Sequence, residues 1–474
     1  MGTRWSVEVF LTLLSIGGIV TVWSEGDTNV TTCSTLEDCS AAGECVDGKC
    51  KCDPGWTGES CGRLDLSPQA NRASGAAWNS HNSSNSSWCI TAPRTDKDEL
   101  GYSSFTKSGT NVTFHIFVSQ MVPGCGLGTW LPGSRIVHAT SNKGVEGPYE
   151  WENQVFSSFH HNPHLTRASD GTWLLYFNGR HWPEDDFNLH TCHQNSTCPS
   201  TSGFWEGDYW HGGGDCKSDG DCKFTANTGV LSPSEHLRGV SRGSSCVKGH
   251  CQCEHHYFGS HCEHLTETVN LAYADSLDGP WTKLLEDGAA FFDDGIESLH
   301  LSNPVAWPLA NGTVIMAYSR APNLGIAVAP HWKGPYTRLY LTTATGEKNY
   351  SLINPDGMFN NTLEKGGEDP FLYQDARGTW HVLFHGYGGD KRWTDGQAAH
   401  SSDLLHWTWQ PEPAYSSTIQ FQDGTAETLS RRERPAVAVD KSGAPLYLLN
   451  GVEPAYPGNS HTYSYIHATS ASRQ

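Results

Sequence analysis

The sequence predicts an all-β protein in which a five-bladed β-propeller carries one cysteine-rich module before it and a second within its second blade. Three observations predict this: a proline-turn-strand pattern that occurs four times, another strand pattern that occurs five times, and a composition rich in turn residues. The 474-residue chain has 50 glycines, 24 prolines and 11% aromatic residues, and no long amphipathic helical pattern. Short strands at a fixed period indicate a propeller or a solenoid.

The proline-turn-strand pattern is clearest where Glu368 and Asp369 precede Pro370. Four prolines are each followed eight residues later by a glycine and then by an apolar, aromatic-rich run: Pro163 and Gly171, Pro304 and Gly312, Pro370 and Gly378, Pro435 and Gly443. The third-strand pattern recurs at Ile136–Ser141, Leu271–Ser276, Ile326–Ala329, Ala398–Ser402 and Tyr465–Ser470. Five third strands predict five blades.

The first and last repeats depart from this pattern. The first has no proline at the equivalent place, and we expect its inner strands at Tyr102–Phe105 and Val112–Met121. The fifth supplies only three strands before the sequence ends. Because an open ring would leave an unpaired strand edge, we expect part of residues 64–92 to pair outside Tyr463–Thr469. Residues 64–87 would then form both a linker and the closing strand.

Residues 1–24 have the character of a secretory signal, since Arg4 is followed by an apolar run from Val9 to Trp23. An uncleaved signal anchor is the alternative, although the run is short for a bilayer span. Eight Asn-x-Ser/Thr acceptors favour a secreted glycoprotein. The balance of 31 basic and 51 acidic residues, a net charge of −20, argues against nucleic acid or an anionic membrane as partner. We expect no cofactor and no metal.

Six cysteines near the N-terminus follow the spacing C-x5-C-x5-C-x4-C-x-C-x8-C, with Gly55, Trp56 and Gly58 between the last two. Spacing alone leaves fifteen connectivities open. Residues 25–63 resemble an epidermal-growth-factor-like module, and this resemblance implies the bridges Cys33–Cys45, Cys39–Cys50 and Cys52–Cys61. Such modules also suggest an extracellular protein partner.

A second cysteine-rich segment is expected in the second blade, because 141 residues separate Pro163 from Pro304 where 66 and 65 separate the later prolines. Residues 212–264 resemble another module of the same type, with Cys216, Cys222, Cys246, Cys251, Cys253 and Cys262. By elimination, Cys192 then pairs with Cys198 and Cys89 with Cys125. A zinc site among these residues is the alternative, which an oxidising compartment disfavours.

The inner strands of a propeller line its central channel, so residues beside the four prolines should converge at one mouth. The predicted ring consists of His160, His161, Asn162, Ser302, Asn303, Glu368, Asp369, Arg432, Glu433 and Arg434. For the first blade, Asp98, Glu99 and the region of Gln120 stay open as contributors.

Blades that open with Asn-Pro, Glu-Asp-Pro or Arg-Pro resemble the five-bladed propellers of the arabinanase, invertase, levansucrase and mannoside phosphorylase superfamily, over residues 88–474. The resemblance implies that carboxylates at the blade openings cleave or transfer glycosyl groups. Glu368 would be the acid in an arabinanase-like alignment, and Asp369 in a phosphorylase-like one. Glu433 would be the partner base, kept ionised by Arg432 and Arg434. His161, Asn162, Asn303, Arg432 and Arg434 would bind the sugar.

Two residues favour a different hypothesis. Asn162 and Asn303 stand where arabinanases have aspartate, and asparagine cannot act as a base. A catalytically inactive carbohydrate-binding or adhesion protein is therefore the second hypothesis, and a signalling ligand acting through the cysteine-rich modules is the third. A purely structural role is the alternative for the carboxylates, which would then satisfy channel N–H groups or an arginine.

Overall fold

The computed structural model describes residues 32–473 with gaps. The gaps are 72–73, 79–84, 99, 104–111, 180–196, 200–203, 207–208, 212–214, 223–243, 254–256, 259–263, 266–267, 285–290, 293–300, 321–322, 354–365, 388–394, 411 and 456–460. The expected signal segment, Cys192 and Cys262 lie outside the described residues. Within the part of the chain that the structure describes, no helix has the length and apolar character needed to span a bilayer.

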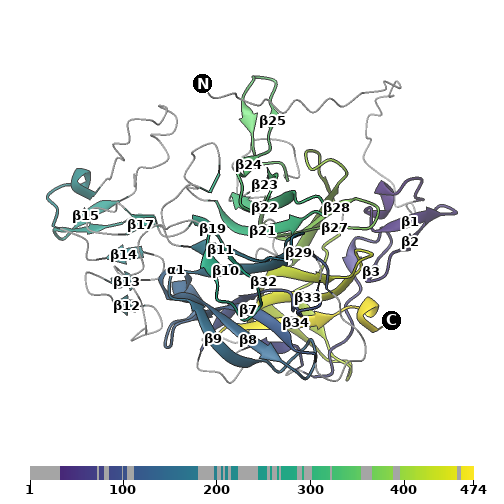
Figure 1. Cartoon of the computed structure of the whole chain (residues 1–474), viewed down its shortest axis with the longest axis horizontal. Helices are drawn as coiled ribbons and strands as arrows, with labels where there is room; N and C mark the ends of the chain where they lie inside the picture. The colour runs from purple at the N-terminus through teal and green to yellow at the C-terminus, as the bar shows by residue number, and fades with distance from the viewer. Residues whose placement is uncertain are drawn as a thin grey trace. The chain divides into compact units, whose positions relative to one another are not determined.

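Five antiparallel sheets form the blades of a propeller (Figure 1). The first blade contains β6 (Ser87–Ile90), β7 (Phe114–Met121), β8 (Ser134–Ser141) and β9 (Glu150–Phe156). The second contains β10 (His161–Arg167), β11 (Trp173–Gly179), β19 (Thr268–Ala274) and β20 (Thr282–Lys283). The third contains β21 (Ser302–Pro308), β22 (Val314–Arg320), β23 (Asn323–Ala329) and β24 (Thr337–Arg338). The fourth contains β27 (Gly366–Gln374), β28 (Trp380–Tyr387), β29 (Gly396–Ser401) and β30 (Thr408–Trp409). The all-β, five-bladed prediction is confirmed.

The fifth blade is completed by a strand from the other end of the chain. Its sheet has the order β31 (Thr418–Gln420), β32 (Ala426–Val439), β33 (Pro445–Pro454), β34 (Tyr463–Ala468) and β5 (Ala76–Trp78). In this sheet β5 pairs antiparallel with β34, with Trp78 opposite Ser464 and Ala76 opposite Tyr465. This is the pairing that the strand count of the fifth repeat predicts.

The first blade differs from its expected layout. Its innermost strand is β6, which precedes the segment Tyr102–Phe105 proposed from the sequence. Tyr102 lies outside any strand, and residues 104–111 are among the gaps. The prediction failed because the first blade lacks the proline that marks the other four openings, so no residue marked the start of its first strand.

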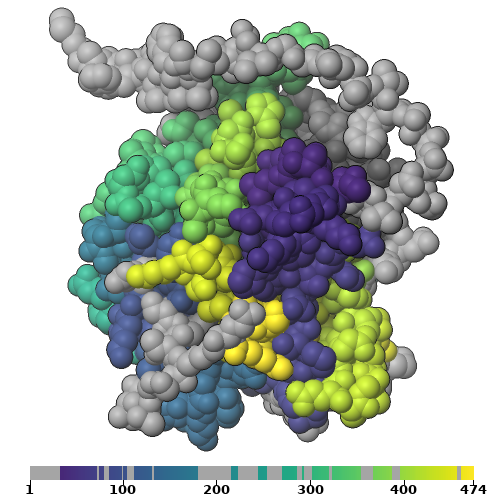
Figure 2. Space-filling model, turned by 90° about the vertical axis from the view of Figure 1, so that its right-hand side faces the viewer, coloured from purple at the N-terminus to yellow at the C-terminus, as the bar shows by residue number. Residues whose placement is uncertain are grey.

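The N-terminal module contains η1 (Glu37–Cys39) and the strands β1 (Gly43–Val46), β2 (Lys49–Cys52), β3 (Trp56–Thr57) and β4 (Arg63–Leu64). Its three bridges are those implied by the resemblance: Cys33–Cys45, Cys39–Cys50 and Cys52–Cys61. Arg377 of the fourth blade forms an ion pair with Asp53 and donates to the Ala41 carbonyl at 2.9 Å. Figure 2 shows the module, in purple, against the light-green part of the chain.

A second cysteine-rich segment lies between β11 and β19, which pair directly in the second blade. It contains β12 (Thr197–Pro199), β13 (Phe204–Glu206), β14 (Tyr209–His211), η3 (Asp219–Cys222), β15 (Ser245–Val247), β16 (His250–Gln252), β17 (Tyr257–Phe258) and β18 (His264–Leu265). Its described bridges are Cys216–Cys246 and Cys222–Cys251. Cys253 is also disulfide-bonded. That residues 212–264 form an inserted module of the epidermal-growth-factor type stays a prediction.

One disulfide prediction is wrong. Cys89 is a free, buried thiol, whereas Cys125 is disulfide-bonded. Elimination failed because Cys89 lies in the innermost strand β6, facing the channel, where its Sγ approaches the Pro163 carbonyl oxygen at 3.7 Å. The pair Cys192–Cys198 stays a prediction.

The remaining elements are η2 (Leu127–Thr129) and α1 (Trp130–Gly133) after β7, the hairpin β25 (Leu341–Thr342) and β26 (Lys348–Asn349), and η5 (Ser470–Arg473). The core lies between the blades: every residue of β11 and of β34 is buried. Strands covered on both faces need apolar residues at consecutive positions, which explains the aromatic-rich runs that follow each turn glycine.

Candidate functional site

The four proline openings share one backbone geometry at the channel. The residue before each proline has a left-handed backbone, with φ of 54° at Asn162, 56° at Asn303, 61° at Asp369 and 54° at Arg434. Each opening also interrupts the regular pairing of its strand with the next. Such irregularities change the direction in which a side chain points. Proline, which has no N–H to donate, is tolerated there because the regular strand pairing is already interrupted. The geometry therefore turns four polar side chains toward one another.

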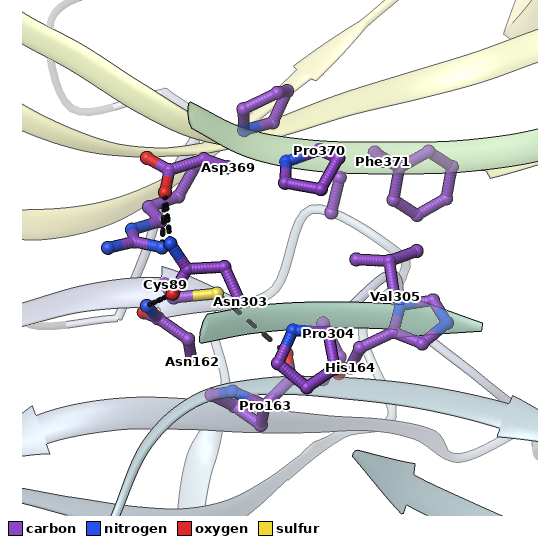
Figure 3. Close-up of a pocket in the computed structure, with 14 residues that line it drawn as sticks. Cys89, Asn162, Pro163, His164, Asn303, Pro304, Val305, Asp369, Pro370 and Phe371 are labelled. Atoms are coloured by element: carbon purple, nitrogen blue, oxygen red, sulfur yellow. Dashed lines mark hydrogen bonds and ion pairs between the residues drawn. The ribbon is translucent and has the colours of Figure 1, made fainter. Parts of the chain in front are cut away.

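These side chains form a connected polar ring, shown in Figure 3. The Asn162 Nδ2 lies 2.6 Å from the Asn303 Oδ1, and the Asn303 Nδ2 donates to the Asp369 Oδ1 at 2.8 Å. The Asp369 carboxylate forms an ion pair with the guanidinium of Arg434. The ring encloses a void of only about 30 Å³, lined also by the four prolines. It is thus a packed structural hub, with room for about one water molecule.

Cys89 takes the place of the ring residue in the first blade. It lines the same small void as Asn162, Asn303, Asp369 and Arg434, and Ile90 follows it where the other blades have proline. Burial raises the pKa of its thiol to about 12, so the thiol stays neutral. The candidates Asp98 and Gln120 do not line this void; Asp98 forms a buried ion pair with Arg94 at 3.8 Å.

A larger cavity of about 400 Å³ lies beside the ring and shares Arg434 with it. The lining residues are Trp88, Leu127, Gly128, Trp130, His161, Glu368, Arg431, Glu433, Arg434 and Glu453. Its volume falls within the range of about 300–1,000 Å³ that is usual for ligand sites. A lining with two tryptophans and three carboxyl groups is suited to a sugar, whose C–H faces pack on aromatic rings while its hydroxyls bond to polar groups.

Glu433 is a carboxyl group of this cavity with a strongly raised pKa. Burial raises the pKa of Glu433 to about 7, and the carboxylates of Asp369 and Glu368 add to the rise, while the charges of His385 and Arg431 oppose it. The residue is 5% exposed, and its Oε1 has no hydrogen-bond partner among the described residues. A carboxyl group in this state keeps its proton up to neutral pH and can donate it.

The expectation that neighbouring arginines keep Glu433 ionised is therefore wrong. Arg432 points away from the cavity, where its Nε donates to the Asn450 Oδ1 at 3.0 Å and its Nη1 to the Ser416 carbonyl at 2.8 Å. Arg434 pairs with Asp369 instead. Alternation along a strand sends Arg432 and Glu433 to opposite faces, so this arginine does not act on the carboxyl group.

His385 on β28 links the ring to the cavity. Its Nδ1 lies 3.3 Å from the Asp369 Oδ2, and it stands opposite Glu368 in the β27–β28 pairing. Burial alone would lower the pKa of His385, but the hydrogen bond to Asp369 and the charges of Glu433, Asp369 and Glu368 raise it overall. The imidazole thus lies beside Asp369, outside the lining of the cavity, and its charge acts on Glu433.

His161 also lines the cavity, as predicted. Its Nδ1 lies 2.7 Å from the Ser134 Oγ, and its ring is 4.9 Å from that of Trp130. Burial and the charge of Arg434 hold the pKa of His161 well below its usual value, so the imidazole is neutral. It can therefore offer a hydrogen bond to a ligand without adding charge.

The structure divides the predicted site residues into two groups. Glu368, Glu433, His161 and Arg434 line the cavity. The other four do not: Asn162, Asn303 and Asp369 belong to the ring and line only the small void, and Arg432 lines neither space. Sequence reasoning missed Trp88, Trp130, Arg431 and Glu453. Trp88 precedes Cys89 in the sequence, as Glu368 precedes Asp369 and Glu433 precedes Arg434. This shared position could have predicted that Trp88 lines the cavity, but only if Cys89 had first been recognised as the ring residue of the first blade.

Parts of the chain are similar to known proteins. A family model described as "Teneurin-like EGF domain" matches residues 36–63. A search of curated proteins finds no match. Solved structures that are similar to this chain include glycoside hydrolases. A family 117 glycoside hydrolase from Zobellia galactanivorans is 15% identical, with 85% of this chain and 90% of that chain covered and a TM-score of 0.42.

Two further structures are similar at the same level. A glycosyl hydrolase from Bacteroides ovatus is 13% identical over 86% of this chain and 93% of that chain, with a TM-score of 0.44. An endo-arabinase from Bacteroides thetaiotaomicron is 11% identical over 85% of this chain and 97% of that chain, with a TM-score of 0.38.

Proposed function

We propose that the protein is an extracellular glycan-acting propeller that cleaves a glycosidic bond in the cavity beside the ring. The observation that carries the proposal is the pair of carboxyl groups, Glu433 and Glu368, that line one cavity in different surroundings. Glu433 is buried with its pKa raised to about 7, whereas Glu368 is partly exposed. Glycoside hydrolysis needs one protonated and one ionised carboxyl group.

In this proposal Glu433 is the general acid, which exchanges the roles expected from the sequence. Glu433 gives its proton to the leaving oxygen as the bond to the anomeric carbon breaks. The ionised Glu368 either acts as a base that activates the attacking water or acts as the nucleophile that attacks the anomeric carbon. Asp369 holds Arg434 and His385 in place and is a positioning residue, because its carboxylate is already engaged by both. Trp88, Trp130 and His161 would contact the sugar.

The extracellular location rests on the disulfides. The described bridges of the N-terminal module form and persist only in an oxidising environment, and a module of this size needs them to fold. The composition of the cavity makes carbohydrate the expected ligand class. An extracellular protein partner that binds the cysteine-rich modules stays a further expectation.

The test is a glycan array combined with a hydrolysis and phosphorolysis screen on purified protein. We expect turnover in the wild type and its loss in Glu433→Gln and Glu368→Gln, with both variants folded. Glu347→Gln, in the exposed turn between β25 and β26, is the matched control and should keep full activity. Binding of a glycan without turnover would support the second hypothesis, an inactive carbohydrate-binding protein, and would overturn the proposed catalysis.

A further inference from the structure

Two buried histidines face each other on neighbouring strands of the first blade. His115 on β7 and His138 on β8 stand diagonally across the pairing, in which His115 is opposite Thr140 and Phe117 is opposite His138. The Nδ1 of His115 lies 2.9 Å from the Nε2 of His138. The two side chains are almost fully buried. Neither residue contributes to the ring or to the larger cavity.

A carboxylate from the second blade completes this cluster. Asp278, in the turn between β19 and β20, places its Oδ1 3.8 Å from the Nδ1 of His115. One ligand atom from each of the three residues lies within 4.8 Å of the other two. The Asp278 side chain is 77% exposed, so the cluster is open to solvent on that side.

Aromatic contacts hold the two blades together around the cluster. The ring of Phe117 stacks on His138 with centroids 4.8 Å apart, and its other contact is an edge-to-face pair with Trp281 at 5.2 Å. Trp281 lies three residues after Asp278 in the same turn. These contacts fix the histidine rings and the turn that carries the carboxylate relative to each other.

We propose that His115, His138 and Asp278 bind a divalent transition-metal ion of the zinc type, which links the first and second blades. Two imidazole nitrogens and a carboxylate oxygen are a donor set that zinc accepts, with water in the fourth position. Zinc–ligand bonds of about 2.0–2.1 Å in a tetrahedron put neighbouring ligand atoms about 3.3 Å apart. The observed separations of 2.9 and 3.8 Å lie on either side of that value.

The surroundings are also suited to a cation. Both rings are almost fully buried, with His115 4% and His138 1% exposed, and the neutral imidazole is the form that binds a metal ion. The charges of Asp96 and Glu152 act on His115 in addition to that of Asp278. The cluster formed by Glu368, Asp369 and His385 is a weaker candidate, because Arg434 already neutralises Asp369.

Calorimetric titration of the chelator-treated full chain with zinc chloride tests the proposal, with cobalt absorption as the second readout. We expect one equivalent to bind and to raise the melting temperature. His138→Gln and Asp278→Asn should each weaken binding at least about tenfold, as loss of a ligand requires. The exposed Asp278→Asn keeps the test valid if His138→Gln misfolds.

The matched control is His406→Gln, which changes an exposed histidine whose Nδ1 lies 2.7 Å from Asp403 but which has no second histidine beside it in the described contacts. It should bind zinc as the wild type does. Two results would overturn the proposal. In one, the wild type binds no zinc, and the contact is only a hydrogen bond between the rings. In the other, Asp278→Asn binds as tightly as the wild type, so the ion sits elsewhere.

Discussion

Asp369 of the fourth blade and Arg434 of the fifth form an ion pair across the channel, and each stands immediately before a proline with a left-handed backbone. Asp369 is buried. Burial of Arg434 lowers the pKa of its guanidinium, but the charges of Asp369 and Glu368 outweigh this effect and raise the pKa overall. Through Asn303 and Asn162 the pair is continued to the third and second blades. The ring therefore couples four blades at the point where the larger cavity begins.

Breaking this ion pair should destabilise the propeller strongly. Arg434→Met removes one partner of a buried ion pair and leaves the Asp369 carboxylate with only His385 as a possible cation beside it, a change that costs about 3–5 kcal/mol in the free energy of unfolding. Urea unfolding measures it. The control is Arg63→Gln, which removes an exposed ion pair with Glu412 and should cost less than about 1 kcal/mol. Equal losses of unfolding free energy in the two variants would show that the Asp369–Arg434 ion pair stabilises the protein no more than an exposed ion pair does.

Turnover should depend on the proton of Glu433. Because the pKa of this buried carboxyl is about 7, the fraction that can donate a proton falls as the pH rises through 7, and the rate should fall with it. His385→Gln removes a positive charge that lowers this pKa, so the alkaline limb should move to higher pH. A pH–rate profile of both proteins checks this; an alkaline limb that stays in place would exclude Glu433 as the acid.

The same carboxyl should make stability depend on pH. Its pKa is raised in the folded state from an unperturbed 4.5 to about 7, so the folded protein binds more protons than the unfolded chain between these values. Stability is therefore fully present below about 4.5 and is lost as the pH rises through 7. Relative to Glu433→Gln, the wild type should lose about 3 kcal/mol between pH 4.5 and 8.5. Parallel stability curves for the two proteins would contradict this.

Much of the propeller was predictable because its repeats obey local rules. The turn glycines Gly171, Gly312, Gly378 and Gly443 all have φ between 83° and 93°, a conformation that glycine adopts without strain. The prolines mark irregular openings that a regular strand would not tolerate. A pattern enforced by backbone geometry is visible in a single sequence, and four copies of it give the period.

The chemistry of the cavity was less predictable because it depends on burial and on contacts between blades. The sequence places Glu433 between two arginines, but the fold turns Arg432 away and buries the carboxyl, which reverses the expected direction of its pKa shift. Trp88 and Trp130 carry no repeat signal, since the first blade lacks the proline that would have aligned them. Burial and contacts between blades depend on residues far apart in the sequence, so no local sequence pattern predicts them.

Cys89 should be a free thiol that reacts only after unfolding. Its side chain is buried in the channel and burial raises its pKa to about 12, so almost no thiolate is available to an alkylating reagent. Iodoacetamide treatment without reduction, followed by peptide mapping, should label Cys89 in urea but not in buffer. If the thiol stays unlabelled in urea, Cys89 is bridged and is not a free thiol in solution.

Closure of the ring by β5 should dominate the stability contributed by the N-terminal segment. Besides the strand pairing, the Ile466 N–H donates to the Gly75 carbonyl at 2.7 Å, and the His467 Nε2 lies 2.7 Å from the Ser67 carbonyl oxygen. Removal of residues 1–80 should therefore lower the melting temperature far more than removal of residues 1–62. The shorter deletion removes most of the N-terminal module but leaves the closing strand.

A pair of glycines separates the closing contact from general backbone strain. Gly75 and Gly424 have nearly the same φ, 82° and 83°. A Cβ at Gly75 would lie 2.5 Å from the Ile466 carbonyl oxygen in β34, whereas a Cβ at Gly424 would meet nothing within 4 Å. Both alanine variants carry the left-handed strain of about 1–3 kcal/mol, but only Gly75→Ala must also push the closing segment off β34. We expect the greater loss of melting temperature in Gly75→Ala; the same loss in both, together with equal melting of the two truncations, would mean that β5 does not close the ring in solution.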